Sequence, residues 1–191
     1  LQQSTVALDV ARLLLGKAAP MDRVFFSTSG AMANENALKI ALQKKFPADR
    51  ILAFEKGFAG RTLALASVTD KAAYREGLPR TLAVDYLPFY HPEEGEASTE
   101  RTMRRLNEFL HRYPGQHALL ILEVIQGEAG FSSATPAFFQ AVIGRAREAG
   151  VLILVDEIQT FGRTTELFAA EQAKIMQLAD LITVGKLTQV C

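Results

Sequence analysis

Cysteine is nearly absent from this chain of 191 residues, and so is any excess of charge of one sign. The single cysteine, Cys191, is the last residue, so no disulfide can form within the chain and a multi-thiolate metal site is excluded. Lysine plus arginine and aspartate plus glutamate both total 21, which gives a formal net charge of 0. Nucleic-acid-binding domains usually carry a basic surface. We therefore expect a reducing, cytoplasmic setting, no metal ion and no nucleic-acid partner.

Long hydrophobic runs, repeats and low-complexity tracts are also missing. No apolar run reaches the ~18 residues that cross a bilayer, and residues 1–17 lack the basic lead of a signal peptide. We expect no membrane role. With 49% hydrophobic and 22% charged residues, the chain has the composition of a globular domain. It has no initiator methionine and stops just after an apolar run, so we expect a piece of a longer protein.

The order of apolar patterns predicts an α/β fold. Continuous aliphatic runs at 118–124 and 151–156 are typical of strands buried on both faces, and shorter runs at 51–54 and 181–184 also predict strands. Apolar residues at helical spacing predict helices over 4–15, 32–45 and 136–150. Strands that alternate with helices form a parallel sheet, and such sheets bind ligands beyond the carboxyl ends of their strands.

One candidate anion site precedes the second predicted helix. The apolar run 24–26 leads into residues 27–31, with the sequence STSGA, at a helix start. Small residues let backbone N–H groups approach an anion, and the helix dipole favours negative charge there. Ordinary helix capping by serine or threonine explains the same residues. The segment matches neither the dinucleotide-binding fingerprint GxGxxG nor the P-loop, which argues against a nucleotide-binding domain.

Two charged residues follow the last two predicted strands. Asp156 ends the run VLILVD, and a buried carboxylate there needs a positive partner, unless it simply caps the next helix or pairs with a surface lysine. Lys186 follows LITV, where a partly buried amine can attack carbonyl groups, although a solvated loop lysine has the same sequence context. A phosphate anchor, an acid and an amine are together what a pyridoxal phosphate site requires.

With these residues in place, the chain resembles the class III, fold type I aminotransferases, which include ornithine, acetylornithine and 4-aminobutyrate aminotransferases. Five segments match the family's motifs in the family's order: SGAMANENALKIA, GFAGRT, EVIQGEAG, VDEIQTFGRT and TVGK. The resemblance implies a three-layer α/β/α fold with a mostly parallel sheet, in which residues 1–191 form part of the cofactor-binding large domain. It also implies that a small C-terminal domain lies outside this chain.

The resemblance implies a catalytic role for Lys186 and Asp156. Lys186 is the counterpart of the Schiff-base lysine that also moves the substrate proton, and Asp156 of the acid that keeps the cofactor's ring nitrogen protonated. Glu123 resembles a supporting acid with no chemical step of its own. The residues implied to hold pyridoxal 5'-phosphate are Ser29, Gly30, Ala31, Phe58, Asp156, Gln159 and Lys186.

For substrates, the resemblance implies amino transfer from an ω-amino acid or diamine to a 2-oxo acid. Arg61 resembles the clamp for a substrate carboxylate, and Glu128 the acid that masks a second arginine of the small domain. A core position for Phe58 and a surface ion pair for Arg61 are the alternatives. The family works as a homodimer. A non-catalytic fragment, or an assembly module that retains the fold, is the competing interpretation. We expect the remaining titratable candidates, His91, His111 and His117, to lie on the surface.

Overall fold

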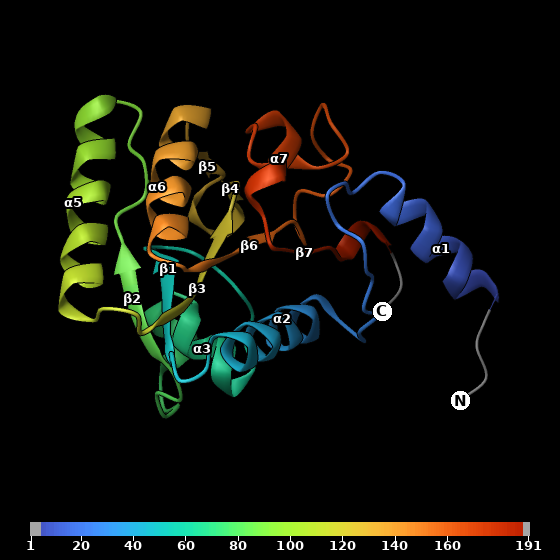
Figure 1. The fold of residues 1–191 in the computed structure, drawn as a ribbon, viewed down its shortest axis with the longest axis horizontal. Coiled ribbons are helices and arrows are strands. Elements are labelled where there is room, and N and C mark those ends of the chain that lie inside the picture. The colour runs from blue at the N-terminus through green and yellow to red at the C-terminus, as the bar shows by residue number, and fades with distance from the viewer. Residues whose placement is uncertain (1–4, 189–191) are drawn as a thin grey trace.

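Five short strands pair side by side into one sheet in the computed structural model, which describes residues 5–188 (Figure 1). The strand order is β2-β1-β3-β6-β7, and every pairing in this sheet is parallel, as the sequence predicts. The strands are β1 (Arg50–Phe54), β2 (Ala83–Leu87), β3 (His117–Glu123), β6 (Leu152–Asp156) and β7 (Leu181–Thr183).

Helices cover both faces of the sheet, which confirms the α/β fold class (Figure 1). One face packs against α5 (Glu96–Arg112), α6 (Pro136–Glu148) and α7 (Ala169–Gln172), and the other against α2 (Gly30–Lys45) and α3 (Leu63–Val68). The helix α1 (Thr5–Leu15) has no fully buried residue, and α4 (Ala72–Arg75) is a single turn. No helix within residues 5–188 is long and apolar enough to cross a bilayer.

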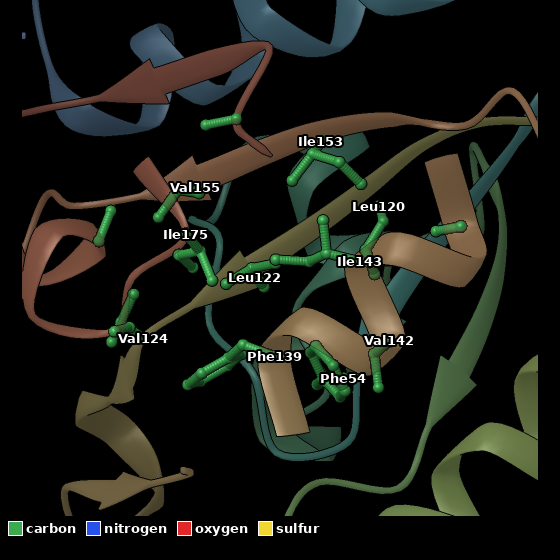
Figure 2. Close-up of a cluster of buried hydrophobic side chains, with 14 of the residues drawn as sticks. Phe54, Leu120, Leu122, Val124, Phe139, Val142, Ile143, Ile153, Val155 and Ile175 are labelled. Carbon is green, nitrogen blue, oxygen red and sulfur yellow. The ribbon is translucent and has the colours of Figure 1, made fainter. Parts of the chain in front are cut away.

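The larger hydrophobic cluster lies between α6 and the sheet (Figure 2). Phe138, Phe139 and Ile143 of α6 have no exposed surface and belong to the same cluster as Leu120 of β3 and Ile153 of β6. Each such side chain contributes about 1.5–3 kcal/mol by leaving water. Because both faces of β3 and β6 are covered in this way, these strands read as continuous aliphatic runs rather than as alternating ones.

Local signals set the ends of the helices. Thr135 accepts a hydrogen bond from the backbone N–H of Phe138, and Pro136 follows at the first helical position of α6. Ser29 caps α2 in the same way, through the backbone N–H of Met32. The predicted helices and strands are therefore observed within a few residues of their expected bounds.

Some short elements were not anticipated. They include β2, α3, α4, α7 and a small antiparallel hairpin made of β4 (Ile125–Gln126) and β5 (Ser132–Ser133). Within residues 5–188 the structure also has 3-10 turns at Gly127–Ala129, Met176–Leu178 and Lys186–Thr188. The apolar run 24–26 joins no strand, and Phe25 is 69% exposed. Unlike the strands that were predicted, which are continuous apolar runs, these short elements mix polar and apolar residues over too few positions for a period to be recognised.

The expected surface position of His117 is wrong. His91 and His111 are exposed, but His117 is only 3% exposed. His117 is the first residue of the central strand β3, and the register between β1 and β3 shifts beside it: Arg50 pairs with His117, whereas Ile51 pairs with Leu119. The His117 ring lies 2.8 Å from the Asp85 carboxylate, which also binds Arg50. The register between two strands that are far apart in the sequence cannot be predicted from the residues around either strand.

Candidate active site

Three polar residues form one row across the carboxyl end of the sheet. Glu123 ends β3, Asp156 ends β6 and Thr183 ends β7, and Asp156 is the register partner of both neighbours. Lys186 lies three residues beyond Thr183, at the start of a 3-10 turn. The topology therefore brings the predicted acid and the predicted amine to the same edge of the sheet, where ligands of parallel α/β proteins bind.

Asp156 is a buried acid held by uncharged donors. One carboxylate oxygen accepts the backbone N–H of Ile158 at 3.0 Å, and the other accepts the side-chain amide of Asn34 at 2.6 Å. Burial raises the pKa of Asp156 to about 6, and the charges of Glu157 and Lys186 act in opposite directions on it. Within residues 5–188 it forms no salt bridge, so its charge is left to be met by a ligand.

Glu123 is the second acid of the row, and it is partly buried. Its carboxylate accepts the backbone N–H groups of Phe58, at 2.9 Å, and Gly127, at 3.3 Å. Burial raises the pKa of Glu123 to about 8, the negative charge of Asp156 adds to the rise, and the two backbone donors and Lys186 oppose it. At neutral pH this side chain is therefore largely protonated, and it positions the loop that bears Phe58.

The amine of Lys186 donates a hydrogen bond to the side-chain oxygen of Gln159. The backbone of Lys186 is left-handed, with a φ of 50°, a conformation that non-glycine residues rarely adopt. Gln159 in turn lies against Gly127, where an added Cβ would come within 3.0 Å of the Gln159 amide carbon. Two of the predicted cofactor-binding residues are thus in direct contact.

The amino end of α2 is close to the segments that follow β6 and β7. A Cβ placed on Gly30 would lie 2.8 Å from Cγ2 of Ile158, and one on Gly185 would lie 3.2 Å from the same atom. The Ser29 hydroxyl already accepts from Met32. Within the described part of the chain, the backbone N–H groups of Gly30 and Ala31 donate to no protein acceptor, as expected of amides available to an anion.

Phe58 lines a small pocket together with Glu123, Asp156 and Gln126. Its ring meets that of Tyr74 edge-on, with centroids 5.7 Å apart. Phe58 is only partly buried and belongs to neither hydrophobic cluster, so the alternative of a core aromatic is not observed.

Of the two predicted substrate-binding residues, Arg61 lies near Tyr74 and Glu128 contacts Lys71, which itself lies near Tyr74. The sequence did not indicate a role for Tyr74. Arg61 is exposed, 5.9 Å from the Tyr74 ring centroid, and it forms no ion pair in the part of the chain that the structure describes. Glu128 forms a half-exposed salt bridge of 3.0 Å with Lys71, whose ammonium is 4.8 Å from the same ring.

Asn34 and Thr183 are the residues of this site that the sequence analysis missed. Both are buried, and the Thr183 hydroxyl donates to the Asn34 side-chain oxygen at 2.7 Å. Asn34 lies within the motif SGAMANENALKIA, but nothing in the neighbouring sequence distinguishes it from Asn36, whose one side-chain hydrogen bond within residues 5–188 is to the carbonyl of Met32 in the same helix. The contact with Asp156 spans 122 positions of sequence.

The residues present fit pyridoxal phosphate. The buried carboxylate of Asp156 has no cationic partner within residues 5–188. The amides without a protein acceptor at the start of α2 lie beside Gly185, since a Cβ on Gly185 would be 3.6 Å from the Cα of Gly30, and Lys186 is the next residue. The protonated ring nitrogen of the cofactor would provide a positive partner for the carboxylate, and its phosphate would provide a negative partner for the amides.

Comparisons with known proteins point the same way. The sequence model of the class III aminotransferases matches residues 2–189. The chain is 36% identical to the acetylornithine aminotransferase of Shewanella oneidensis, over 94% of this chain and 42% of that protein. It is 34% identical to the adenosylmethionine-8-amino-7-oxononanoate aminotransferase of Synechococcus elongatus, over 95% and 44%.

The solved structure of lysine aminotransferase from M. tuberculosis superposes with a TM-score of 0.87 at 26% identity, covering 99% of this chain and 47% of that one. The chain therefore spans less than half the length of the relatives it matches.

Proposed function

Because the chain belongs to the class III aminotransferases, a family dependent on pyridoxal phosphate, we propose that the protein containing it transfers an amino group to a 2-oxo acid. The observation that carries this proposal is the position of Asp156 and Lys186 at the same edge of the sheet. Asp156 is a buried acid without a cationic partner among the described residues, and Lys186 is an amine near enough to influence its ionisation.

Bound pyridoxal phosphate supplies an aldehyde that condenses with amines and a ring that withdraws electrons from the substrate carbon. Asp156 would face the ring nitrogen, where its negative charge favours the protonated form. Lys186 would bind the aldehyde end, and its amine would then hold and return the proton of the substrate carbon. Gln159, which contacts Lys186, would donate to the ring hydroxyl oxygen.

The phosphate would be held at the amino end of α2. The N–H groups of Gly30 and Ala31, which have no acceptor among residues 5–188, and the hydroxyl of Ser29 lie at the positive end of the helix dipole. Phe58 would lie against the ring, in the pocket that it lines with Asp156.

We further propose an ω-amino acid or diamine as the amine donor. The matched proteins named for acetylornithine and lysine support this substrate class. Arg61 is exposed and without an ion pair in residues 5–188, so its planar guanidinium is available to a substrate carboxylate. Glu128 would serve as the acid that alternates between partners, and Lys71 is its partner in this structure.

The wider organisation is proposed on the same grounds. Residues 1–191 would be part of the large, cofactor-binding domain, with the small C-terminal domain outside this chain, because the matched relatives are more than twice as long. A homodimer is proposed on the family resemblance alone. The near-absence of cysteine supports a cytoplasmic location.

The proposal is tested by adding pyridoxal phosphate to the intact protein, reducing with borohydride and mapping the labelled peptide. We expect the label on Lys186, together with amino transfer from ω-amines to 2-oxoglutarate or pyruvate. Lys186→Ala should lose both the label and turnover, while Lys174→Ala, a control on another left-handed lysine, should keep them.

Label spread over surface lysines without preference for Lys186 would contradict the proposal. Specific label on Lys186 without turnover of any amine would favour the alternative, a fold retained for binding or assembly.

A further inference from the structure

The side chain of Asn34 connects four separate segments of the candidate site. It projects from α2, is completely buried, and its nitrogen donates to Asp156 at 2.6 Å and to the backbone carbonyl of Ala59 at 2.8 Å. Its oxygen accepts from the Thr183 hydroxyl at 2.7 Å. Both amide protons and the amide oxygen are therefore engaged, each by a different segment.

These partners determine which way the amide faces. The carbonyl of Ala59 can only accept a hydrogen bond, so the nitrogen of Asn34 must point toward it. The oxygen is then directed at Thr183, whose hydroxyl can donate. As a result, Asp156 must receive an N–H donor from Asn34, and a donor to a carboxylate favours its charged form.

We propose that Asn34 is a positioning residue, which keeps the Asp156 carboxylate ionised and oriented toward the ring nitrogen and ties that orientation to the loop bearing Phe58. The link to the loop runs through the carbonyl of Ala59, the residue after Phe58. The part of this inference that concerns the cofactor rests on the proposed function. The part that concerns Asn34 and Asp156 does not.

The charges around Asp156 make this support necessary. Glu157 follows Asp156 in the chain, and its charge raises the pKa of Asp156, while Lys186 lowers it. Glu123 lies opposite on β3, and the charge of Asp156 raises the pKa of Glu123 in turn. Burial raises the pKa of Asp156 to about 6. Ile158 and Asn34 are its uncharged donors, and only Asn34 provides a side chain that substitution can remove.

The first test uses the protein without cofactor. A double-mutant cycle combines Asn34→Ala and Asp156→Asn, and unfolding by denaturant is measured at pH 5 and at pH 8. The coupling is the factor by which the effect of the double variant on the unfolding equilibrium constant departs from the product of the two single effects. Because Asp156 is ionised mainly at pH 8, we expect this factor to be about tenfold larger at pH 8 than at pH 5. Packing alone would give the same coupling at both pH values.

The second test measures binding of pyridoxal phosphate to the intact protein. We expect Asn34→Ala to weaken binding about tenfold to a hundredfold, the range of a hydrogen bond to a charged group. Thr183→Val keeps the shape of the side chain but removes the hydroxyl that orients the Asn34 amide, so it should also weaken binding, by less than Asn34→Ala does. This variant replaces Asn34→Ala in the test if Asn34→Ala does not fold. Asn36→Ala, whose side chain bonds only within α2, should bind like the parent.

Equal coupling at pH 5 and pH 8, or unchanged cofactor binding by both Asn34→Ala and Thr183→Val, would overturn the inference. If the parent protein bound no pyridoxal phosphate while the coupling still rose with pH, the proposed function would fail and the role of Asn34 toward Asp156 would stand.

Discussion

At the scale of single residues, Glu123 and Asp156 are placed in surroundings that disfavour their charged forms. They lie on neighbouring strands, Asp156 buried and Glu123 partly buried. Desolvation is the largest cause of the raised pKa of each, about 8 for Glu123 and about 6 for Asp156. A fold optimised only for stability would not place two such groups together. Raised pKa values of this kind cluster at functional sites, where charge is retained for a ligand.

We predict that Glu123→Gln stabilises the cofactor-free protein increasingly as the pH rises. The pKa of Glu123 is higher in the folded chain, about 8, than its ordinary value of 4.5, so folding favours the protonated form. The resulting stability is complete below pH 4.5 and is lost as the pH rises to 8. The difference in unfolding free energy between variant and parent should therefore grow by on the order of 2–4 kcal/mol from pH 5 to pH 9.

Denaturant unfolding across this range provides the measurement. Glu108→Gln is a suitable control, since Glu108 is half-exposed in a pair with Arg105. A difference that stays constant with pH would contradict the expected ionisation of Glu123.

At the scale of elements, α6 contains one glycine inside the helix, Gly144, and is followed by another, Gly150, and the two have different structural roles. Gly144 lies inside the helix with no atom within 4 Å of a Cβ built on it. Gly150 follows the helix with a φ of 77°, a conformation that favours glycine, and its N–H bonds to the carbonyl of Arg147. The sequence predicts the end of the helix from Gly150 because this requirement is local.

Two substitutions in and after α6 should therefore act in opposite directions. Gly144→Ala should raise the free energy of unfolding by about 0.5–1 kcal/mol, because alanine loses less backbone entropy in a helix. Gly150→Ala should lower it by about 1 kcal/mol, because the left-handed conformation is strained for a residue with a Cβ. Thermal or urea unfolding measures both changes. A higher free energy of unfolding in both variants would contradict the prediction and show that residue 150 adopts another backbone conformation without strain.

At the scale of the whole molecule, a second polar cluster lies near the amino ends of the strands, away from the candidate site. Asp85 of β2 accepts two hydrogen bonds of 2.8 Å from Arg50 of β1 and contacts His117 of β3 at 2.8 Å. Although burial opposes ionisation, these partners hold the pKa of Asp85 below its ordinary value. The guanidinium of Arg50 also lies 3.6 Å from the Tyr113 ring centroid.

Arg50→Met should destabilise the protein by about 3 kcal/mol at pH 7, because Asp85 would be left buried without its guanidinium partner. Arg12→Met, which removes a fully solvated pair with Asp9, should change stability by less than about 0.5 kcal/mol. Denaturant unfolding at low and high salt gives both values. Similar small effects for the two variants would show that the cluster contributes no net stability.

Much of this arrangement was accessible to sequence reasoning because its signals are local. The aliphatic runs predict β3 and β6, and residues at the ends of strands in a parallel sheet must share one edge, so Asp156 and Lys186 could be brought together in advance. The helix α2 was expected from its apolar spacing, and Ser29 from its capping preference. Short elements such as α4, and with it Tyr74, carry no comparable periodicity.

The sequence by itself determined the α/β fold class, the principal strands and the chemistry of the residues that follow them. Only the tertiary structure decided that Asn34 meets Asp156 and Thr183, and that His117 is buried. Propensity, capping and burial on both faces act over a few residues, so they can be read along the chain. The partners of Asn34 and His117 depend on which distant strands come to lie beside each other and in which register, and that choice depends on packing over the whole sheet.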